Sequence, residues 1–188
     1  MKPQTGILHR FFFALVPDIV TARRTDLFAE ALAGGARRLP IAHQHMTLTI
    51  TNDYEAPPPD LVTRLRKAAD SVIAPPFDLT LDQLAVGNRS AALRPGRRVP
   101  ALFALQGRLA SAMRAVDVPM RIDYRFSPHA TLFYRRGRPD NRPVPGFLWQ
   151  VRHFVLIHSE VGRTRHNRLG CWPLTSDSVP DGQLALKL

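Results

Sequence analysis

One short pattern occurs twice in this sequence: a histidine, any residue, a threonine and a leucine. The first copy is His45–Leu48 and the second is His129–Leu132. A neutral imidazole accepts a proton and an imidazolium donates one, both near pH 7. A threonine hydroxyl donates a hydrogen bond to a phosphate oxygen without adding charge. Two facing copies would supply an acid, a base and two oxygen ligands, which suits metal-free cleavage of a phosphodiester.

Both copies lie in stretches that are typical of β-strands. Residues two apart on a strand point to the same side, so His45 and Thr47 share one face, and so do His129 and Thr131. A single His-x-Thr on a strand is usually structural. Two copies, each followed by leucine, favour a functional interpretation and suggest two halves whose strands face a shared groove.

A metal site is the main chemical alternative. His43 and His45 form a His-x-His pair that can bind zinc, with His129 as a third ligand. This alternative leaves Thr47 and Thr131 unexplained, so we expect no metal. No glycine-rich phosphate loop is present, so we expect no ATP and no other cofactor. The remaining histidines are expected to be structural or at the surface: His9, His153, His158 and His166.

Arginine dominates the charge of the chain. The formal net charge is +11, and only three of the 26 basic residues are lysines, namely Lys2, Lys67 and Lys187. The planar guanidinium matches phosphate in a bidentate way, so a polyanion, above all a nucleic acid, is the expected partner. A compositional preference for arginine would also explain the charge. Phe11, Phe12 and Phe13 are expected in the core, although one of them could line a cleft and stack a base.

The expected elements alternate between strands and helices. The Arg-, Pro- and Gly-rich stretch 135–146 is expected to be a mobile surface loop, and the tail after Ser176 to be poorly ordered. Helices are expected at 19–33, from Pro57–Asp60 to Pro75, and at 100–116. Strands are expected at 10–16, 45–50, 77–82, 89–93, 130–134, 153–159 and 169–174.

Length and composition point to one domain over residues 1–188, ordered from about 9 to 175. The longest apolar run, Phe11–Val16, is far shorter than the ~20 residues that span a bilayer, so we expect no membrane association. The single cysteine, Cys171, excludes an internal disulfide and suits the cytoplasm; beside Trp172 it is expected to be buried. We expect a monomer without a protein partner.

The paired tetrapeptides resemble those of the 2H phosphoesterase superfamily, in particular its RNA 2′,3′-cyclic phosphodiesterase branch, once called 2′–5′ RNA ligases. The similarity runs from about residue 9 to residue 175. Further segments match that branch in the same order: Arg10–Leu15, Phe77–Asp82, Phe126–Leu132, Pro145–Phe147 and Gly162–Arg165.

The resemblance implies an α+β fold with two pseudosymmetric lobes, antiparallel sheets flanking a central cleft, and helices outside. It implies that His45 protonates the leaving ribose oxygen and that His129 activates water. Thr47 and Thr131 would hold the non-bridging phosphate oxygens. The implied substrate is RNA or a nucleotide with a terminal 2′,3′-cyclic phosphate, and the product is a 2′-phosphomonoester.

The sequence departs from the family pattern at two places. Thr49–Asp53 stands where members often have phenylalanine, leucine and glycine, and Tyr134 stands where they often have an arginine. The next residue, Arg135, is therefore the candidate arginine for the substrate, with Arg136 after it. Two other functions stay open: an RNA-end-binding module without catalysis, and a 2H enzyme for 2′–5′ linked oligonucleotides or ADP-ribose cyclic phosphate.

Overall fold

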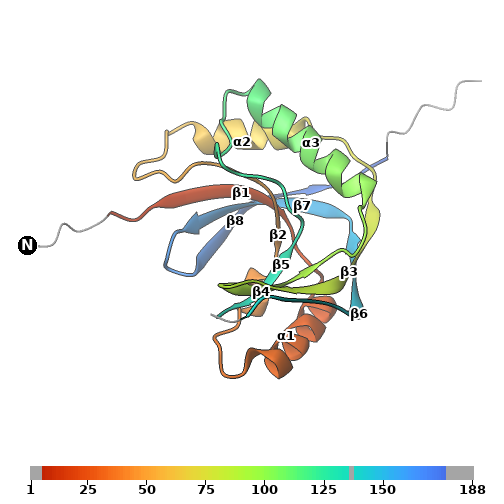
Figure 1. The fold of residues 1–188 in the computed structure, drawn as a ribbon. Helices are drawn as coiled ribbons and strands as arrows, with labels where there is room; N and C mark the ends of the chain where they lie inside the picture. Colours follow the sequence, from red (N-terminus) through yellow and green to blue (C-terminus); the bar gives the residue numbers. More distant parts are fainter. Residues whose placement is uncertain (1–5, 136–137, 177–188) are drawn as a thin grey trace, which may run out of the picture.

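The computed structural model describes residues 6–135 and 138–176, which form an α+β fold with two antiparallel sheets (Figure 1). The predicted fold class is confirmed. The α-helices are α1 (Ile19–Ala33), α2 (Leu61–Asp70) and α3 (Pro100–Ala115), and a short 3-10 helix spans Ile41–His43. The strands are β1 (His9–Leu15), β2 (Met46–Ile50), β3 (Phe77–Val86), β4 (Ser90–Arg94), β5 (Ala130–Tyr134), β6 (Asp140–Val151), β7 (His153–Glu160) and β8 (Arg165–Pro173).

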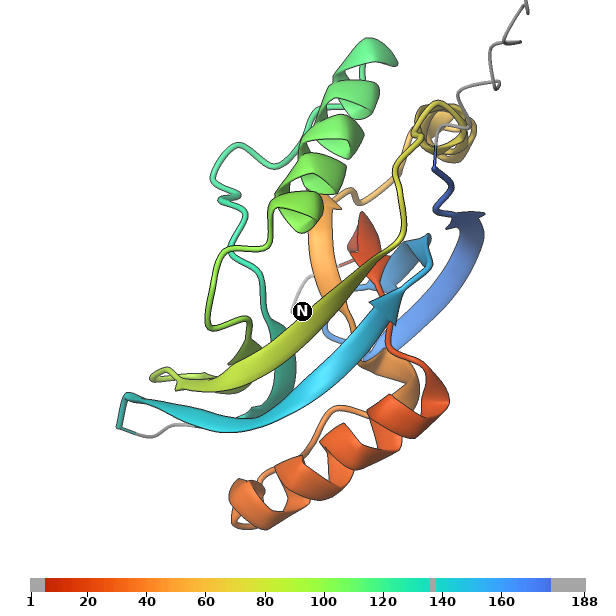
Figure 2. The same cartoon turned by 90° about the vertical axis from the view of Figure 1, so that its right-hand side faces the viewer.

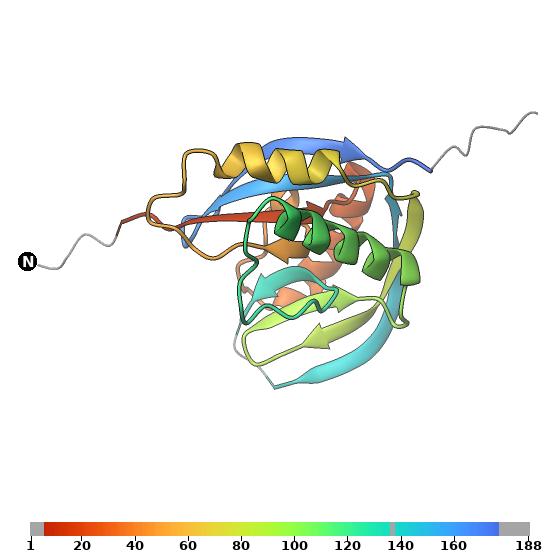
Figure 3. The ribbon, with the colours of Figure 1, turned by 90° about the horizontal axis from the view of Figure 1, so that it is seen from above.

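Each sheet has four strands, and the chain crosses between them. The first sheet has the order β2-β1-β7-β8, so it joins the two ends of the described chain, whereas the second has the order β5-β4-β3-β6. Helices α2 and α3 lie side by side over the first sheet, and α1 lies at the opposite end of the molecule, against the second sheet (Figures 1 and 3). Each histidine motif therefore belongs to a different sheet.

The alternation of side chains on β1 separates the core from the face that carries the site. Phe11 and Phe13 point into the main core, where Phe13 is fully buried. Phe12 and Ala14 point to the other face and form a small cluster with residues of β7. Because successive strand residues face opposite sides, the three phenylalanines divide between core and site.

Helix α1 begins and ends at residues that its sequence predicts. Asp18 caps the N-terminus: its carboxylate accepts hydrogen bonds from the Thr21 backbone N–H at 2.9 Å and from the Thr21 hydroxyl at 2.7 Å. Gly34 ends the helix with φ 53°, in the left-handed region where glycine is favoured. The predicted range 19–33 is confirmed.

Strand β6 corrects the expectation of a mobile loop over 135–146. It starts at Asp140 and pairs along most of its length with β3, and Figure 2 shows the two strands curving together. Pro143 and Pro145 fit there because β6 is an edge strand, where a missing N–H donor costs no ladder bond. Arg136 and the tail after Ser176 lie outside the described residues. Cys171 is exposed, not buried as expected.

Among the described residues, none of the helices has both the length and the apolar character needed to cross a membrane.

Candidate active site

The two histidine motifs meet at one cavity of about 550 Å³. His45 directly precedes β2 and His129 directly precedes β5, so each motif begins where a strand of a different sheet begins. Thr47 and Thr131, one residue into each strand, also line the cavity. Since β2 and β5 pack against each other, residues that are far apart in the sequence come together as the repeated pattern predicts.

Both imidazole rings are held in the same way. Nδ1 of His45 donates to the backbone carbonyl of His43 at 2.7 Å, and Nδ1 of His129 donates to the carbonyl of Ser127, also at 2.7 Å. A carbonyl oxygen only accepts hydrogen bonds, so Nδ1 carries the hydrogen in each ring. Proton exchange with a bound molecule is therefore left to Nε2 of each histidine.

The His45 ring is enclosed by other rings on one wall of the cavity. The Phe12 ring lies 5.0 Å away and the His166 ring 5.4 Å away, measured between ring centroids. His166 in turn stacks on His43 at 4.5 Å. His166 was expected to be structural or at the surface, and the structure instead places it in the cavity wall.

Burial favours the neutral form of the His45 ring. Desolvation lowers its pKa, the hydrogen bond to the His43 carbonyl opposes this, and the charges of His129 and His43 add to the lowering. Desolvation also lowers the pKa of His166 to about 4, so that ring is neutral at pH 7. His129, by contrast, is exposed at the cavity mouth.

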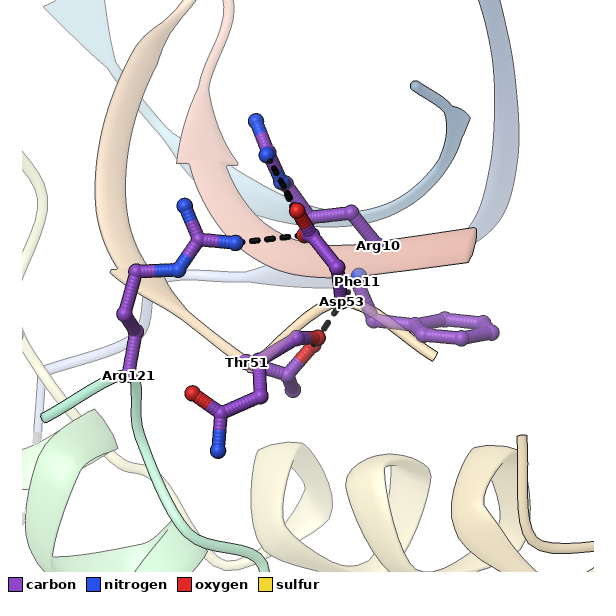
Figure 4. A network of polar contacts seen from close by, with 6 residues as sticks. Arg10, Phe11, Thr51, Asp53 and Arg121 are labelled. Carbon is purple, nitrogen blue, oxygen red and sulfur yellow. Dashed lines mark hydrogen bonds and ion pairs between the residues drawn. The ribbon is translucent and has the colours of Figure 1, made fainter. Parts of the chain in front are cut away.

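An arginine from β1 also lines the cavity, and a carboxylate fixes its direction (Figure 4). Nε and Nη2 of Arg10 donate to the two carboxylate oxygens of Asp53 at 2.6 and 2.8 Å. Arg121 donates to the same carboxylate. The hydrogen bond from Arg10 is the main cause that lowers the pKa of Asp53, so the carboxylate stays charged at neutral pH. One acid and two arginines leave a net positive charge here.

Arg135, the arginine expected to contact substrate, is not in the cavity lining. Its Nη1 donates to the carbonyl of Leu32 at 3.1 Å, near the end of α1, and its guanidinium lies 5.4 Å from the Phe133 ring centroid. The exposed side chain of Tyr134 lines the cavity instead. The reason is strand alternation: one step along the chain changes the side to which a side chain points.

Sequence reasoning did not single out Arg10. Its only signal was its position two residues before Phe12 on a predicted strand, which puts both on one face. The zinc alternative finds no geometric support, since none of the His, Cys, Asp and Glu residues in 6–135 and 138–176 form a group of three or more that could hold a metal ion.

Comparison with known proteins decides the family. A family model described as the 2′-5′ RNA ligase superfamily matches residues 17–163. The chain belongs to this superfamily. Its members are 2H phosphoesterases, and membership therefore places phosphoester chemistry at the cavity where the two histidine motifs meet.

Solved structures of superfamily-like proteins share the fold. E. coli LigT, complexed with 3′-AMP, matches with a TM-score of 0.76 and 21% sequence identity, over 90% of this chain and 99% of that one. TT0787 of Thermus thermophilus matches with a TM-score of 0.69 and 21% identity, over 89% of this chain and 99% of that one. A search of curated protein sequences gave no significant match.

Proposed function

We propose that the protein hydrolyses the terminal 2′,3′-cyclic phosphate of RNA or of a nucleotide to a 2′-phosphomonoester, without a metal. The observation that carries the proposal is the matched pair of imidazoles. Each has its Nδ1 hydrogen occupied by a backbone carbonyl two residues earlier, and each lines the same cavity. Acid–base cleavage needs two such groups at one phosphorus atom, whereas simple binding does not.

In the proposed reaction, Nε2 of neutral His129 takes a proton from water as the water oxygen attacks phosphorus. The bond from phosphorus to O3′ breaks, and protonated His45 gives its Nε2 proton to that oxygen. The hydroxyls of Thr47 and Thr131 donate to the non-bridging oxygens, where negative charge accumulates. At the end His129 holds the extra proton and His45 is neutral, so a return of one proton restores the site.

The lowered pKa of His45 constrains this assignment. In the free protein, burial disfavours the imidazolium that must act as the acid. A cyclic phosphate carries a negative charge, and its arrival beside the ring favours the charged form. Substrate binding therefore protonates the acid, so the proton donor is loaded only when a phosphate is present.

Arg10 is the arginine that we assign to the substrate in place of Arg135. Asp53 occupies one edge of its guanidinium, and Figure 4 shows a further nitrogen pointing away from that carboxylate. A guanidinium held in this way is oriented before the ligand arrives, which lowers the entropy lost on binding. A nucleotide ligand is supported by the fold relative LigT, whose structures include complexes with ATP and NADP+.

Assay against a panel of cyclic phosphates tests the proposal. The panel contains nucleoside 2′,3′-cyclic phosphates, oligoribonucleotides ending in one, 2′–5′ linked oligonucleotides and ADP-ribose cyclic phosphate. Turnover of the first two classes, unchanged by EDTA, is expected. Activity confined to the last two would move the protein to another substrate within the superfamily, and binding without turnover would favour an RNA-end-binding module. Loss on chelation with recovery on adding zinc would favour a metal at His43, His45 and His129.

A further inference from the structure

A second hollow, of about 480 Å³, lies on the other side of the turn that carries His129. We call it the arginine groove and define it by Arg94, Arg97, Arg98, Phe103 and Pro128. The β4–α3 connection forms one wall, and the segment leading into β5 lies beside it (Figure 2). The groove shares no lining residue with the catalytic cavity.

The lining of the arginine groove is cationic and contains no acidic residue. Its three arginines are exposed and carry their charge at every physiological pH. The nearby carboxylate of Asp82 is already engaged, since its Oδ1 accepts a hydrogen bond from the Gly96 backbone N–H at 2.6 Å. A hollow with three positive charges and no counter-charge in its lining fits an anionic ligand.

Two of the groove residues are arranged for a flat ring as well as for an anion. The guanidinium of Arg98 lies over the ring of Phe103, 4.3 Å from its centroid. Phe103 meets Phe126 edge-on at 5.3 Å and is half-buried, so the ring is held in place from behind. An arginine on an aromatic ring uses one face for that contact and keeps its N–H edge for phosphate oxygens, and such pairs also stack nucleobases.

The groove is joined to the catalytic histidine by three consecutive residues. Arg94 donates to the Ser127 hydroxyl, and its Nε donates to the Pro128 carbonyl at 3.4 Å. The Ser127 carbonyl accepts the hydrogen bond that holds His129. Pro128 lines the groove, and its neighbour His129 lines the cavity. The two hollows are thus separated by one turn, across which a chain of linked phosphates can pass.

We propose that the arginine groove binds the phosphodiester backbone of single-stranded RNA whose terminal nucleotide occupies the catalytic cavity. This inference rests on the proposed function and names its substrate class: an oligonucleotide in preference to a mononucleotide. Arg97 and Arg98 contact phosphates, Phe103 supports Arg98 and offers a face to a base, and Arg94 positions the turn that carries His129.

The test compares an oligonucleotide with a mononucleotide, each ending in a 2′,3′-cyclic phosphate. In the double variant Arg97→Gln/Arg98→Gln, KM for a hexaribonucleotide should rise about tenfold, while KM and kcat for the mononucleotide stay unchanged. The salt dependence of log KM for the hexamer should fall by about 1.4, because each lost phosphate contact on a single strand removes roughly 0.7. Phe103→Leu should raise KM for the hexamer only.

The matched control is Arg23→Gln/Arg24→Gln, which removes the same charge from two exposed arginines of α1. If both double variants raise KM equally, general charge and not the groove is responsible, and the proposal is overturned. An unchanged KM for the hexamer in Arg97→Gln/Arg98→Gln overturns it as well.

A binding measurement separates failure of the groove from failure of the proposed function. If no cyclic phosphate is turned over, the proposed function fails, and fluorescence anisotropy with a labelled hexaribonucleotide ending in a 3′-phosphate still tests the groove. The same loss of affinity in Arg97→Gln/Arg98→Gln, and not in the α1 control, supports RNA binding there. Equal affinity for wild type and variant contradicts it.

Discussion

At the scale of single residues, the two histidines are defined by what holds their rings. A buried imidazole without a partner at Nδ1 could exchange its tautomer, whereas a carbonyl acceptor fixes it. His45 and His129 each have such a carbonyl two residues earlier in the chain, at the same 2.7 Å. The equality of the two contacts is what makes one ring a counterpart of the other.

Replacing either ring should therefore remove catalysis and leave the fold in place. We expect His45→Ala and His129→Ala each to lower kcat by about 10²-fold or more, the scale of lost general acid–base catalysis. Circular dichroism should show an unchanged fold. His153→Ala, on β7 and outside the cavity lining, is the control and should retain activity. Near-normal turnover in either motif variant would contradict the two-histidine mechanism.

Two arginines that lie close to the motifs should behave in opposite ways. Arg10→Lys keeps the charge but loses the paired contact with Asp53, so KM for a cyclic mononucleotide should rise several-fold. Arg135→Gln loses only its bond to the Leu32 carbonyl near the end of α1 and should cost about 0.5 kcal/mol of stability without changing KM. Steady-state kinetics and urea unfolding of both variants measure this. A raised KM in Arg135→Gln would restore Arg135 as a substrate contact.

The residues that sequence reasoning found and missed differ in one respect. His45, Thr47, His129 and Thr131 could be recognised because each pair is local and the pattern repeats. Arg10 and His166 could not, because their places in the cavity depend on which strands pair with β1 and β7. Pairing between strands that are distant in sequence leaves no local trace.

At the scale of elements, strand pairing overrides local composition. The stretch that ends at Gly146 contains prolines and arginines and is typical of a loop, yet β6 extends from Asp140 through it. The predicted helices, in contrast, are present, because the periodicity of 3.6 residues and the capping residues are written within each segment. What the sequence could not supply was the partner strand β3, whose backbone satisfies the hydrogen bonds of β6.

The wall formed by the 3-10 helix and β8 should make the protein sensitive to acid. Desolvation lowers the pKa of His43, His45 and His166 in the folded state, the last to about 4, and the Nδ1 of His166 is buried without a hydrogen-bond partner. Between their unfolded pKa near 6.5 and the lower folded values, the unfolded chain binds more protons than the folded one. Stability therefore falls as the pH drops through this window.

His166→Phe tests this account, because phenylalanine keeps a ring against His43 but cannot take up a proton. The decrease in Tm from about pH 7 to about pH 5 should be smaller in the variant than in the wild type. Thermal unfolding followed by circular dichroism at both pH values measures the difference. An equal decrease in both proteins would show that His166 does not contribute to acid sensitivity.

At the scale of the whole molecule, the cavity exists only when both sheets are complete. One sheet joins the first two strands of the chain to the last two, and the other is built from the middle of the chain. The repeated pattern in the sequence predicted two halves facing a groove, and this much is confirmed. The interleaving of the halves could not be predicted, because it depends on β7 returning to pair with β1.

The two-sheet arrangement also leads to a prediction about which bond of the substrate breaks. The attacking oxygen must lie opposite the leaving oxygen, because displacement at phosphorus runs in line. His129, from one sheet, would sit beside the water, and His45, from the other, beside the leaving oxygen. A 2′,3′-cyclic phosphate offers O2′ and O3′, and a fixed pair of histidines admits only one of them.

With His45 as the acid, we expect O3′ to leave and the product to be predominantly the 2′-monophosphate. Phosphorus NMR of the product from a cyclic mononucleotide, compared with authentic 2′- and 3′-monophosphates, measures the ratio. A mixture of the two would show that the ribose is not held in one orientation. A predominant 3′-phosphate would mean that the sugar lies the other way round or that His45 acts as the base, the role that its lowered pKa favours in the free protein. The pH dependence of kcat/KM in His45→Ala and His129→Ala then tells these two apart, because the variant that lacks the base loses the acidic limb.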